Sequence, residues 1–250
     1  MRISKVRDLT LIKLTEDKNL VVACDSCGGI GSKPEDALKV PAYIVGKLTA
    51  RVALMEVLCT GAEVVTITDA VCNEMEPTGK EIIRGIKEEL KEAKINEVTL
   101  NGSTEENFPT KATGLGVTVV GIVDNNNMKV NNITKDCLLI SIGIPKVGKE
   151  IDIFGYDEEI ASYNHISTIL NNQEAYEIVP VGSKGILFEA EELAKNNRCE
   201  FYLNKDKIDV DIRRSAGPAT VMIAAVSKKA YENLKDIQNI NLLGEIKKGT

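Results

Sequence analysis

The stretch from Val21 to Lys33, VVACDSCGGIGSK, could support two different chemistries. Cys24 and Cys27 have the C-x-x-C spacing of half a zinc site or of a redox centre. Asp25 lies where an apolar run ends, and three glycines follow it. A carboxylate beside glycines can hold Mg²⁺ over phosphates, because Mg²⁺ prefers oxygen ligands and glycine lets backbone N–H groups approach a phosphate closely. The glycines of this loop are Gly28, Gly29 and Gly31.

The cysteine pair has few partners in the rest of the chain. A structural zinc site needs four ligands, usually in two spaced pairs, but the chain has six scattered cysteines and a single histidine, His165. A redox C-x-x-C would open a helix, whereas Cys24 ends an apolar strand. These features favour small thiols that flank Asp25. The glycines also fit a plain turn, since their spacing matches neither G-x-x-x-x-G-K-[ST] nor G-x-G-x-x-G.

Three further places carry polar groups suited to a phosphate site. Asp8 lies just before the first predicted strand, and Glu56 lies on a predicted helix over 42–60. The run Asn101–Asn107 brings amide, hydroxyl and carboxylate groups after a short strand. A single acidic residue is most often a solvated surface group. The prediction of a phosphate site therefore depends on these residues taken together. The residues that share the helix face of Glu56 are small: Thr49, Ala53 and Thr60.

Strands and helices alternate along the chain and place these residues. In the first half, period-2 patterns predict strands over 9–14, 20–24, 64–71, 97–101 and 114–123. A second helix follows Pro77, where Thr78 and Glu81 form a capping-box pattern. The polar, aperiodic stretch 124–132 predicts a linker. Beyond it we expect strands over 137–144, 175–181, 199–203 and 219–226, and helices near 157–171, 184–196 and 227–236. The pattern predicts an α+β protein of two domains, residues 1–124 and 136–250.

Composition narrows the function classes. The chain has 250 residues and a formal net charge of −6, which argues against a nucleic-acid partner because a phosphate-backbone reader needs a basic face. No apolar run approaches the roughly 18 residues of a membrane span, and the N-terminal run lacks a signal-peptide core. We therefore expect a cytoplasmic protein with no membrane partner and with reduced cysteines.

Taken in chain order, these features resemble the ATP-binding superfamily of aminoimidazole ribonucleotide (AIR) synthetase, thiamine-monophosphate kinase, selenophosphate synthetase and the hydrogenase-maturation dehydratase. In thiamine-monophosphate kinase an Asp-rich run precedes the first strand, and Val6–Thr10 matches it with Asp8. Asp25 matches a strand-end Asp. Leu54–Ala62 matches a Leu-Ser-Asp-x-x-Ala-Met-Gly-Ala run, with Glu56 in the Asp position.

The resemblance continues, with departures, through the rest of the chain. Asn101, Gly102, Ser103 and Thr104 match a Gly-Gly-Asp-Thr run, so Ser103 replaces an expected Asp. Ser183–Gly185 lies where the second domain of the family has Ser-Asp-Gly. Within the superfamily the runs RDLTLI, ACDSCGGIGSKP, GSTEENFPT and RRSAGPAT resemble alpha-ribazole kinase of cobalamin salvage, which implies phosphorylation of a nucleoside 5′-hydroxyl.

The resemblance implies roles for the residues named above. It implies ATP and Mg²⁺ as cofactors, with Mg²⁺ held by Asp8, Asp25, Glu56 and, where Ser103 has lost its carboxylate, Glu105 or Glu106. The glycine loop and Asn101–Thr104 would contact phosphates. Lys33 is a candidate for the γ-phosphate, although a solvated loop lysine is an equal interpretation.

The sequence does not determine which residue accepts the substrate proton. It also does not determine which residues line the side of the site that binds the phosphate acceptor. Asp25 or Glu74 could accept the substrate proton, and His165 lies on the polar side of a predicted helix. Arg213 and Arg214 could form the acceptor-side wall or lie on the surface. The implied AIR synthetase-like fold has an N-terminal sheet-plus-helices domain that pairs into a dimeric barrel, hence a homodimer, and a C-terminal α+β domain that completes the substrate cleft.

Two alternatives to a small-molecule kinase remain. One is another ATP-using member of the superfamily, of the thiamine-monophosphate kinase type or an amide-activating synthetase. The other is a non-catalytic nucleotide-binding protein, which the substitution at Ser103 suggests.

Overall fold

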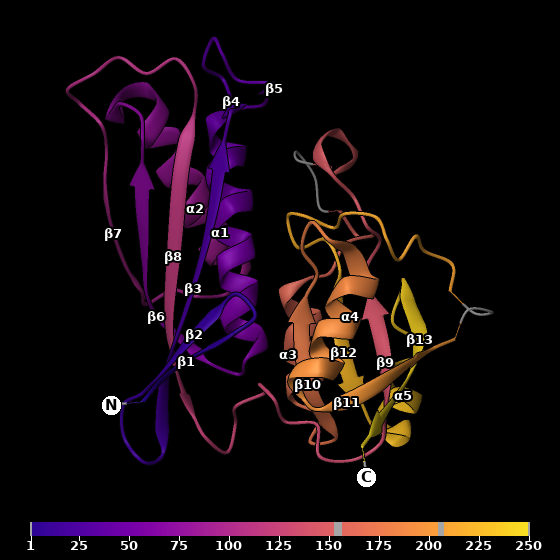
Figure 1. The fold of residues 1–250 in the computed structure, drawn as a ribbon. Helices are drawn as coiled ribbons and strands as arrows, with labels where there is room; N and C mark the ends of the chain where they lie inside the picture. The colour runs from indigo at the N-terminus through magenta and orange to yellow at the C-terminus, as the bar shows by residue number, and fades with distance from the viewer. Residues whose placement is uncertain (1, 153–156, 205–207, 250) are drawn as a thin grey trace. The chain divides into compact units, whose positions relative to one another are not determined.

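The structure is a computed structural model that describes residues 2–152, 157–204 and 208–249. Its chain divides into two compact units. Unit 1 comprises Met1–Leu58 and Ala62–Asn125, and unit 2 comprises Cys59–Gly61 and Asn126–Thr250. Each unit contains one large sheet with helices, so the protein is mixed α/β (Figure 1). The assignment of separate functional roles to residues 1–124 and 136–250 stays a prediction.

Unit 1 is built on a six-stranded sheet in the order β1-β2-β3-β8-β6-β7. All neighbours are antiparallel except β6 and β7, which are parallel. The strands are β1 (Ile3–Val6), β2 (Leu9–Lys13), β3 (Lys18–Gly28), β6 (Glu63–Val71), β7 (Thr99–Ser103) and β8 (Gly114–Asp124). A short parallel pair, β4 (Ile30–Gly31) and β5 (Leu38–Lys39), follows β3. The five strands predicted in this half are confirmed, and β1 was missed.

Alternation along β8 separates the two faces of this sheet. Leu115, Val117, Val119, Gly121 and Val123 are buried, and the residues that alternate with them are half-buried. Helices α1 (Ala42–Cys59) and α2 (Lys80–Glu92) lie on the buried side (Figure 1). A Cβ added at Gly121 would meet the Val57 side chain of α1. No described helix of unit 1 lies on the other face (Figure 1).

The start of α2 differs from the prediction. A π-type turn, Met75–Gly79, leads directly into α2, so Gly79 already has helical torsions and makes no side-chain cap. The Thr78 hydroxyl donates instead to Glu74 Oε1 at 2.5 Å. The predicted capping box of Thr78 and Glu81 is therefore wrong, because the preceding turn takes the place of an N-cap.

Unit 2 is built on an antiparallel sheet in the order β10-β12-β9-β13-β11. The strands are β9 (Cys137–Ile142), β10 (Ala175–Pro180), β11 (Cys199–Leu203), β12 (Met222–Val226) and β13 (Ile240–Lys248). The helices are α3 (Tyr163–Leu170), α4 (Gly185–Asn196) and α5 (Lys228–Leu234), with a short 3₁₀ turn at Gly148–Glu150. Every residue of β9, β10 and β12 is buried. This core includes α4 residues Ile186, Ala190 and Leu193. The predicted elements are confirmed with shifts of a few residues, most at the start of α3, and β13 was missed.

None of the described helices combines the length and the apolar character that a bilayer crossing would require.

Two glycines let α1 and α2 cross at close range. A Cβ at Gly46 would overlap the carbonyl oxygen of Ile82, and one at Gly85 would overlap the carbonyl oxygen of Tyr43. Both obstacles are backbone atoms, which cannot rotate away as a side chain would. The helix layer of unit 1 therefore depends on the absence of side chains at these two positions.

We predict that Gly85→Ala lowers the free energy of unfolding by about 2 kcal/mol, because the added Cβ would overlap a backbone oxygen and the overpacking cost then lies at the upper end of its range. Alanine gains about 1 kcal/mol in helix propensity, but overpacking against a backbone costs about 1–3 kcal/mol or more. Chemical denaturation measures the difference. The exposed Lys87 on the same helix supplies the control, since Lys87→Ala should change stability by less than about 0.5 kcal/mol. A Gly85→Ala protein as stable as the wild type would contradict the close crossing.

Candidate functional site

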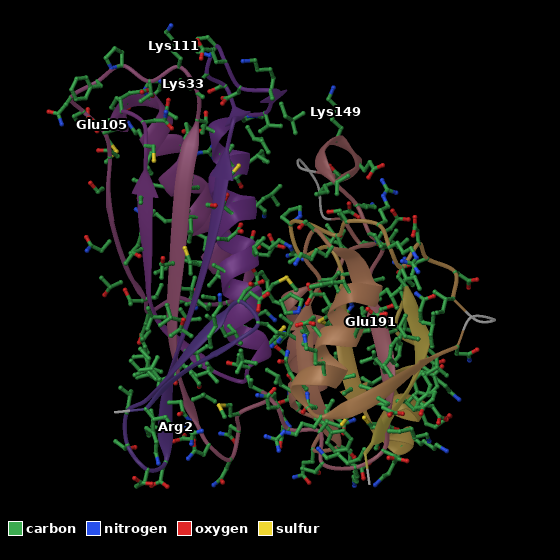
Figure 2. The ribbon with its side chains drawn as sticks, viewed as in Figure 1. Arg2, Lys33, Glu105, Lys111, Lys149 and Glu191 are labelled. Atoms are coloured by element: carbon green, nitrogen blue, oxygen red, sulfur yellow. The ribbon has the colours of Figure 1, made fainter. Side chains whose placement is uncertain are left out.

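The glycine loop after β3 is held against the segment that leads into β8. The Gly29 N–H donates to the Thr113 carbonyl at 2.9 Å, and the Glu35 N–H donates to the Lys111 carbonyl at 2.9 Å. Figure 2 places Lys33, Lys111 and Glu105 at the same end of unit 1. The loop is therefore fixed at one end of the sheet, where β3 finishes.

The buried Asp36 side chain holds this loop in place through hydrogen bonds. Its carboxylate is only 5% exposed and accepts from the Thr113 N–H and hydroxyl at 2.7 Å each, and from the Lys33 N–H at 2.8 Å. Burial by itself would raise the pKa of Asp36, but these donors outweigh it and that pKa lies below its ordinary value. Gly31 has a positive φ of +153°, and a Cβ there would overlap Thr113 and crowd Asp36. Asp36 and Gly31 thus set the path of the loop that carries Lys33.

Asp25 lies near the end of β3 and is half-buried. Burial raises the pKa of its carboxyl to about 6, and the negative charge of Asp8 adds to the rise, against a Ser26 N–H that lowers it. Asp8 is exposed in the turn between β1 and β2. The structure therefore brings two of the predicted metal ligands close enough to repel one another.

The cysteine pair is divided by the strand itself. Cys24 and Cys27 both lie on β3, three residues apart, and successive side chains of a strand point to opposite faces. Cys24 is exposed, whereas burial raises the pKa of Cys27, whose thiol interacts with the Thr49 hydroxyl of α1. Two side chains on opposite faces cannot bind one ion or form a disulfide without rebuilding the strand. Both thiols are free.

The predicted metal ligands are not gathered into one cluster. In the described parts of the chain, no group of three or more His, Cys, Asp or Glu side chains is placed to hold a metal ion. Glu105 accepts from the Asn107 N–H at 2.6 Å, and Glu106 accepts from the Met75 N–H at 2.8 Å and from the Thr104 hydroxyl at 2.9 Å. Glu105 therefore binds its own loop, and Glu106 joins that loop to the turn that leads into α2. Glu56 is half-buried on α1, and its role as a ligand stays a prediction, as does that of Glu105.

Magnesium is nevertheless compatible with the pair Asp8 and Asp25. Mg²⁺ is commonly bound by one or two carboxylates together with substrate phosphates and waters, rather than by an all-protein cage. Two carboxylates that repel each other supply such a partial ligand set, since a cation bound by both would remove the repulsion. The donor chemistry of the site thus fits a metal that arrives with a phosphate chain.

The segment Asn101–Thr104 lies at the edge of the sheet. Asn101, Gly102 and Ser103 are exposed residues of β7, which pairs only with β6 in the described sheet. Thr104 is half-buried and follows the strand. The backbone of this segment is accessible from outside, as a phosphate-binding segment must be, and its assignment stays a prediction.

Lys33 is already engaged in an ion pair. Its ammonium lies 2.5 Å from Glu74 Oε2, and its side chain is 17% exposed. Burial would raise the pKa of Glu74, but Lys33 and the Thr78 hydroxyl outweigh it and hold that pKa below its ordinary value. A phosphate could draw Lys33 away from Glu74, so the predicted contact stays a prediction. Glu74 is a poor proton acceptor in this arrangement.

The sequence reasoning missed Asp69, a buried carboxylate on β6. It is 6% exposed, and burial raises the pKa of its carboxyl. It follows Ile67 and precedes Val71 on the buried face of the strand. The signal was available, because an Asp at an inward position of an alternating strand breaks the period-2 pattern.

The residues singled out in unit 2 have structural partners. His165 and Ser162 cap α3 reciprocally, with the Ser162 N–H donating to His165 Nδ1 at 3.1 Å. Arg214 forms an ion pair with Glu150. The Lys184 ammonium lies over the Phe188 ring at 4.2 Å from its centroid. The Arg213 and Arg214 carbonyls lie against Gly185, which has a φ of +84°.

The first half of the chain is similar to a known domain family. Residues 6–123 match the family model of the AIR synthase related protein, N-terminal domain. This match supports the superfamily expected from the sequence. No curated protein sequence matches the chain.

Solved structures extend the similarity over almost the whole chain, which thus has an AIR synthase-like fold. Thermotoga maritima PurL complexed with ADP has a TM-score of 0.71 and 14% identity, and the match covers 98% of this chain but 42% of PurL. Thiamine-monophosphate kinase from Stenotrophomonas maltophilia has a TM-score of 0.64 and 15% identity. The match covers 99% of this chain and 89% of that kinase. AaThiL complexed with AMPPCP and TMP has a TM-score of 0.66 and 14% identity. The match covers 98% of this chain and 87% of AaThiL. This chain therefore spans less than half of PurL and most of the two kinases.

We predict that Asp25→Asn makes the metal-free protein more stable at pH 8, by about 1 kcal/mol after allowing for solvent screening. A carboxyl whose pKa rises from 3.8 to about 6 on folding stabilises the fold below pH 3.8, and this stabilisation is lost as the pH rises through 6. The amide carries no such loss. Thermal unfolding in the presence of a chelator measures the difference from pH 4 to pH 8.

The difference should shrink toward zero as the pH falls to 4. The exposed Asp17 supplies a control, since Asp17→Asn should track the wild type at every pH. An Asp25→Asn protein less stable than the wild type at pH 8 would contradict the raised pKa of Asp25. It would show that other groups of the fold stabilise the charged carboxylate.

Proposed function

We propose that this protein is an ATP-dependent kinase that transfers the γ-phosphoryl group of ATP to a hydroxyl group of a small molecule. The observation that carries the proposal is the similarity to thiamine-monophosphate kinase and to AaThiL, the latter complexed with AMPPCP and TMP, over most of both chains. Nearly every part of those kinases has a counterpart here. At 14–15% identity the similarity concerns the fold, so the residues of unit 1 must carry the chemistry.

Unit 1 has the parts that phosphoryl transfer asks of a protein, chiefly positioning and charge stabilisation. Asp8 and Asp25 would hold Mg²⁺, which when bound neutralises phosphate charge. The glycine loop, fixed by Asp36, would bring its backbone close to phosphate oxygens, while the Gly29 N–H stays bound to the Thr113 carbonyl. Lys33 would exchange its partner Glu74 for the γ-phosphate, and Asn101–Thr104 would contribute N–H and hydroxyl donors.

The finer proposal concerns the acceptor. The runs around Asp8, Asp25, Ser103 and Arg214 resemble alpha-ribazole kinase, so we propose the 5′-hydroxyl of alpha-ribazole as the acceptor and cobalamin salvage as the role. A synthetase activity is the second candidate, favoured by the TM-score of 0.71 with PurL, which has also been solved with FGAR. The 42% coverage of PurL weakens it, because more than half of that chain has no counterpart here.

The test is ADP release from MgATP with alpha-ribazole, other nucleosides, TMP and FGAR supplied one at a time. We expect release that depends on alpha-ribazole, and an Asp25→Asn rate lower by about 100-fold or more, the scale of losing a preorganised charge-stabilising group. Asp17→Asn should keep the wild-type rate.

Other outcomes separate the rivals. Release with FGAR alone would favour the synthetase. Binding of MgATP without release for any acceptor would favour a non-catalytic nucleotide-binding protein and would overturn the kinase.

We also propose a homodimer that forms through the helix-free face of the unit 1 sheet. On that face Leu20 pairs with Ile122 and Val22 pairs with Val120, and all four side chains are half-buried. A second copy laid on this face would bury these apolar groups, at about 25 cal/mol per Å² of apolar area.

Light scattering after gel filtration should give twice the chain mass for the wild type and the single-chain mass for Val120→Arg, because a charge in an apolar interface loses its hydration. Tyr202→Arg, on an exposed residue of unit 2, should stay dimeric. A monomeric wild type at micromolar concentration would rule out this dimer.

A further inference from the structure

Asp69 is a buried carboxyl group with an oxygen that lacks a donor. Its exposed fraction is 6%, and none of the described residues donates a hydrogen bond to its Oδ1 atom. A buried polar atom without a hydrogen bond costs about 1–3 kcal/mol, so folded proteins rarely keep one without a use. Asp69 is therefore a group whose partner is expected from outside the chain.

Gly102 makes the space in which this carboxyl lies. Asp69 pairs with Gly102 across β6 and β7, and a Cβ at Gly102 would overlap both carboxyl oxygens and Cγ of Asp69. Gly102 is itself exposed. The carboxyl thus packs against the backbone of the edge strand β7, in the segment proposed to bind phosphate. A ligand held along β7 can therefore reach it.

The sheet register relates Asp69 to Asp25. Asp25 pairs with Val117 on β8, and Val117 pairs with Asp69 on β6, so the two carboxyls lie in one row on one face. With neighbouring strands about 4.8 Å apart, their backbones are separated by roughly 10 Å. Val117 is fully buried, so a ligand reaches Asp69 from the β7 side. The separation keeps the proposed metal-binding carboxyl apart from one that could serve the acceptor.

We propose that Asp69 accepts the hydrogen bond, and then the proton, of the acceptor's hydroxyl group. The inference rests on the proposed kinase function and supplies its missing base. The acceptor O–H bond breaks and its proton passes to Asp69 Oδ1. The acceptor oxygen forms a bond to the γ-phosphorus, and the bond between that phosphorus and the β,γ-bridging oxygen breaks with its electron pair left on ADP.

The other candidates for this role are occupied. Glu74 is bound by Lys33 and Thr78, and His165 caps α3 through Nδ1. The negative charge of Asp8 acts on Asp25, whose proposed role is to bind the metal. Asp69 combines burial with an Oδ1 atom that lacks a donor, and burial raises the pKa of its carboxyl, which makes the carboxylate a stronger base.

The experiment compares Asp69→Asn, Asp69→Ala and a control, Glu63→Gln, which changes an exposed carboxylate on the same strand. We expect Asp69→Asn to lower kcat for acceptor-dependent ADP release by about 100-fold or more, the scale of general-base catalysis. Its affinity for AMPPCP with Mg²⁺, measured by calorimetry, should stay within about twofold of the wild type. Glu63→Gln should retain the wild-type kcat.

Asp69→Ala supplies a second readout that a structural role would not move. The substitution removes the carboxyl beside Gly102, and added formate should restore part of the lost kcat by supplying a carboxylate in its place. Thermal unfolding should show both variants folded, because loss of a buried carboxyl without a donor removes a cost.

The outcomes distinguish the two proposals. If the wild type releases ADP and Asp69→Asn stays within about fivefold of it, or if formate leaves Asp69→Ala unchanged, the role of Asp69 is overturned and the kinase stands. If Asp69→Asn loses AMPPCP affinity in parallel with kcat, Asp69 supports nucleotide binding instead. If the wild type releases no ADP with any acceptor, both proposals fall.

Discussion

The antiparallel pairing of β3 with β8 is the interaction on which the candidate site depends. It runs in unbroken register from Lys18 opposite Asp124 to Gly28 opposite Gly114. This register aligns Asp25 with Val117 and, through β8, with Asp69. The same extended geometry sends Cys24 and Cys27 to opposite faces. A slip of one residue would exchange the two faces of β3, expose its apolar residues and separate the row of carboxyls.

Four carboxylates of unit 1 show how the fold treats buried negative charge. Asp36 receives three donors and Glu74 is bound by Lys33 and Thr78, so both have a lowered pKa and hold the structure in place. Asp25 and Asp69 have a raised pKa, because burial outweighs the Ser26 N–H at Asp25 and is the one cause of the shift at Asp69. The charges of Asp36 and Glu74 are balanced by hydrogen bonds and ion pairs within the chain. Burial of Asp25 and Asp69 carries a free-energy cost that a ligand could relieve, and these two residues lie on one face of the sheet.

The alternation of apolar residues was enough to find most strands and the helix α1, because burial of one face imposes a period on the sequence. It missed β1, whose residues are mostly exposed, and β13 at the C-terminal end. The capping box at Thr78 was wrong, since a local pattern cannot reveal that a turn already precedes the helix. Residue types and order also suggested Asp8 and Asp25, and the structure shows that these two carboxyls interact.

The sequence by itself determined the class of fold, the glycine loop and the carboxylates that could accompany it, because these follow from residue types and local periodicity. Only the tertiary structure decided which side chains meet. It placed Glu105 against its own loop, joined Lys33 to Glu74 and left the Oδ1 atom of Asp69, beside Gly102, without a donor. The physical reason is that strand register and helix crossing set contacts between residues far apart in the chain, and no local pattern encodes them.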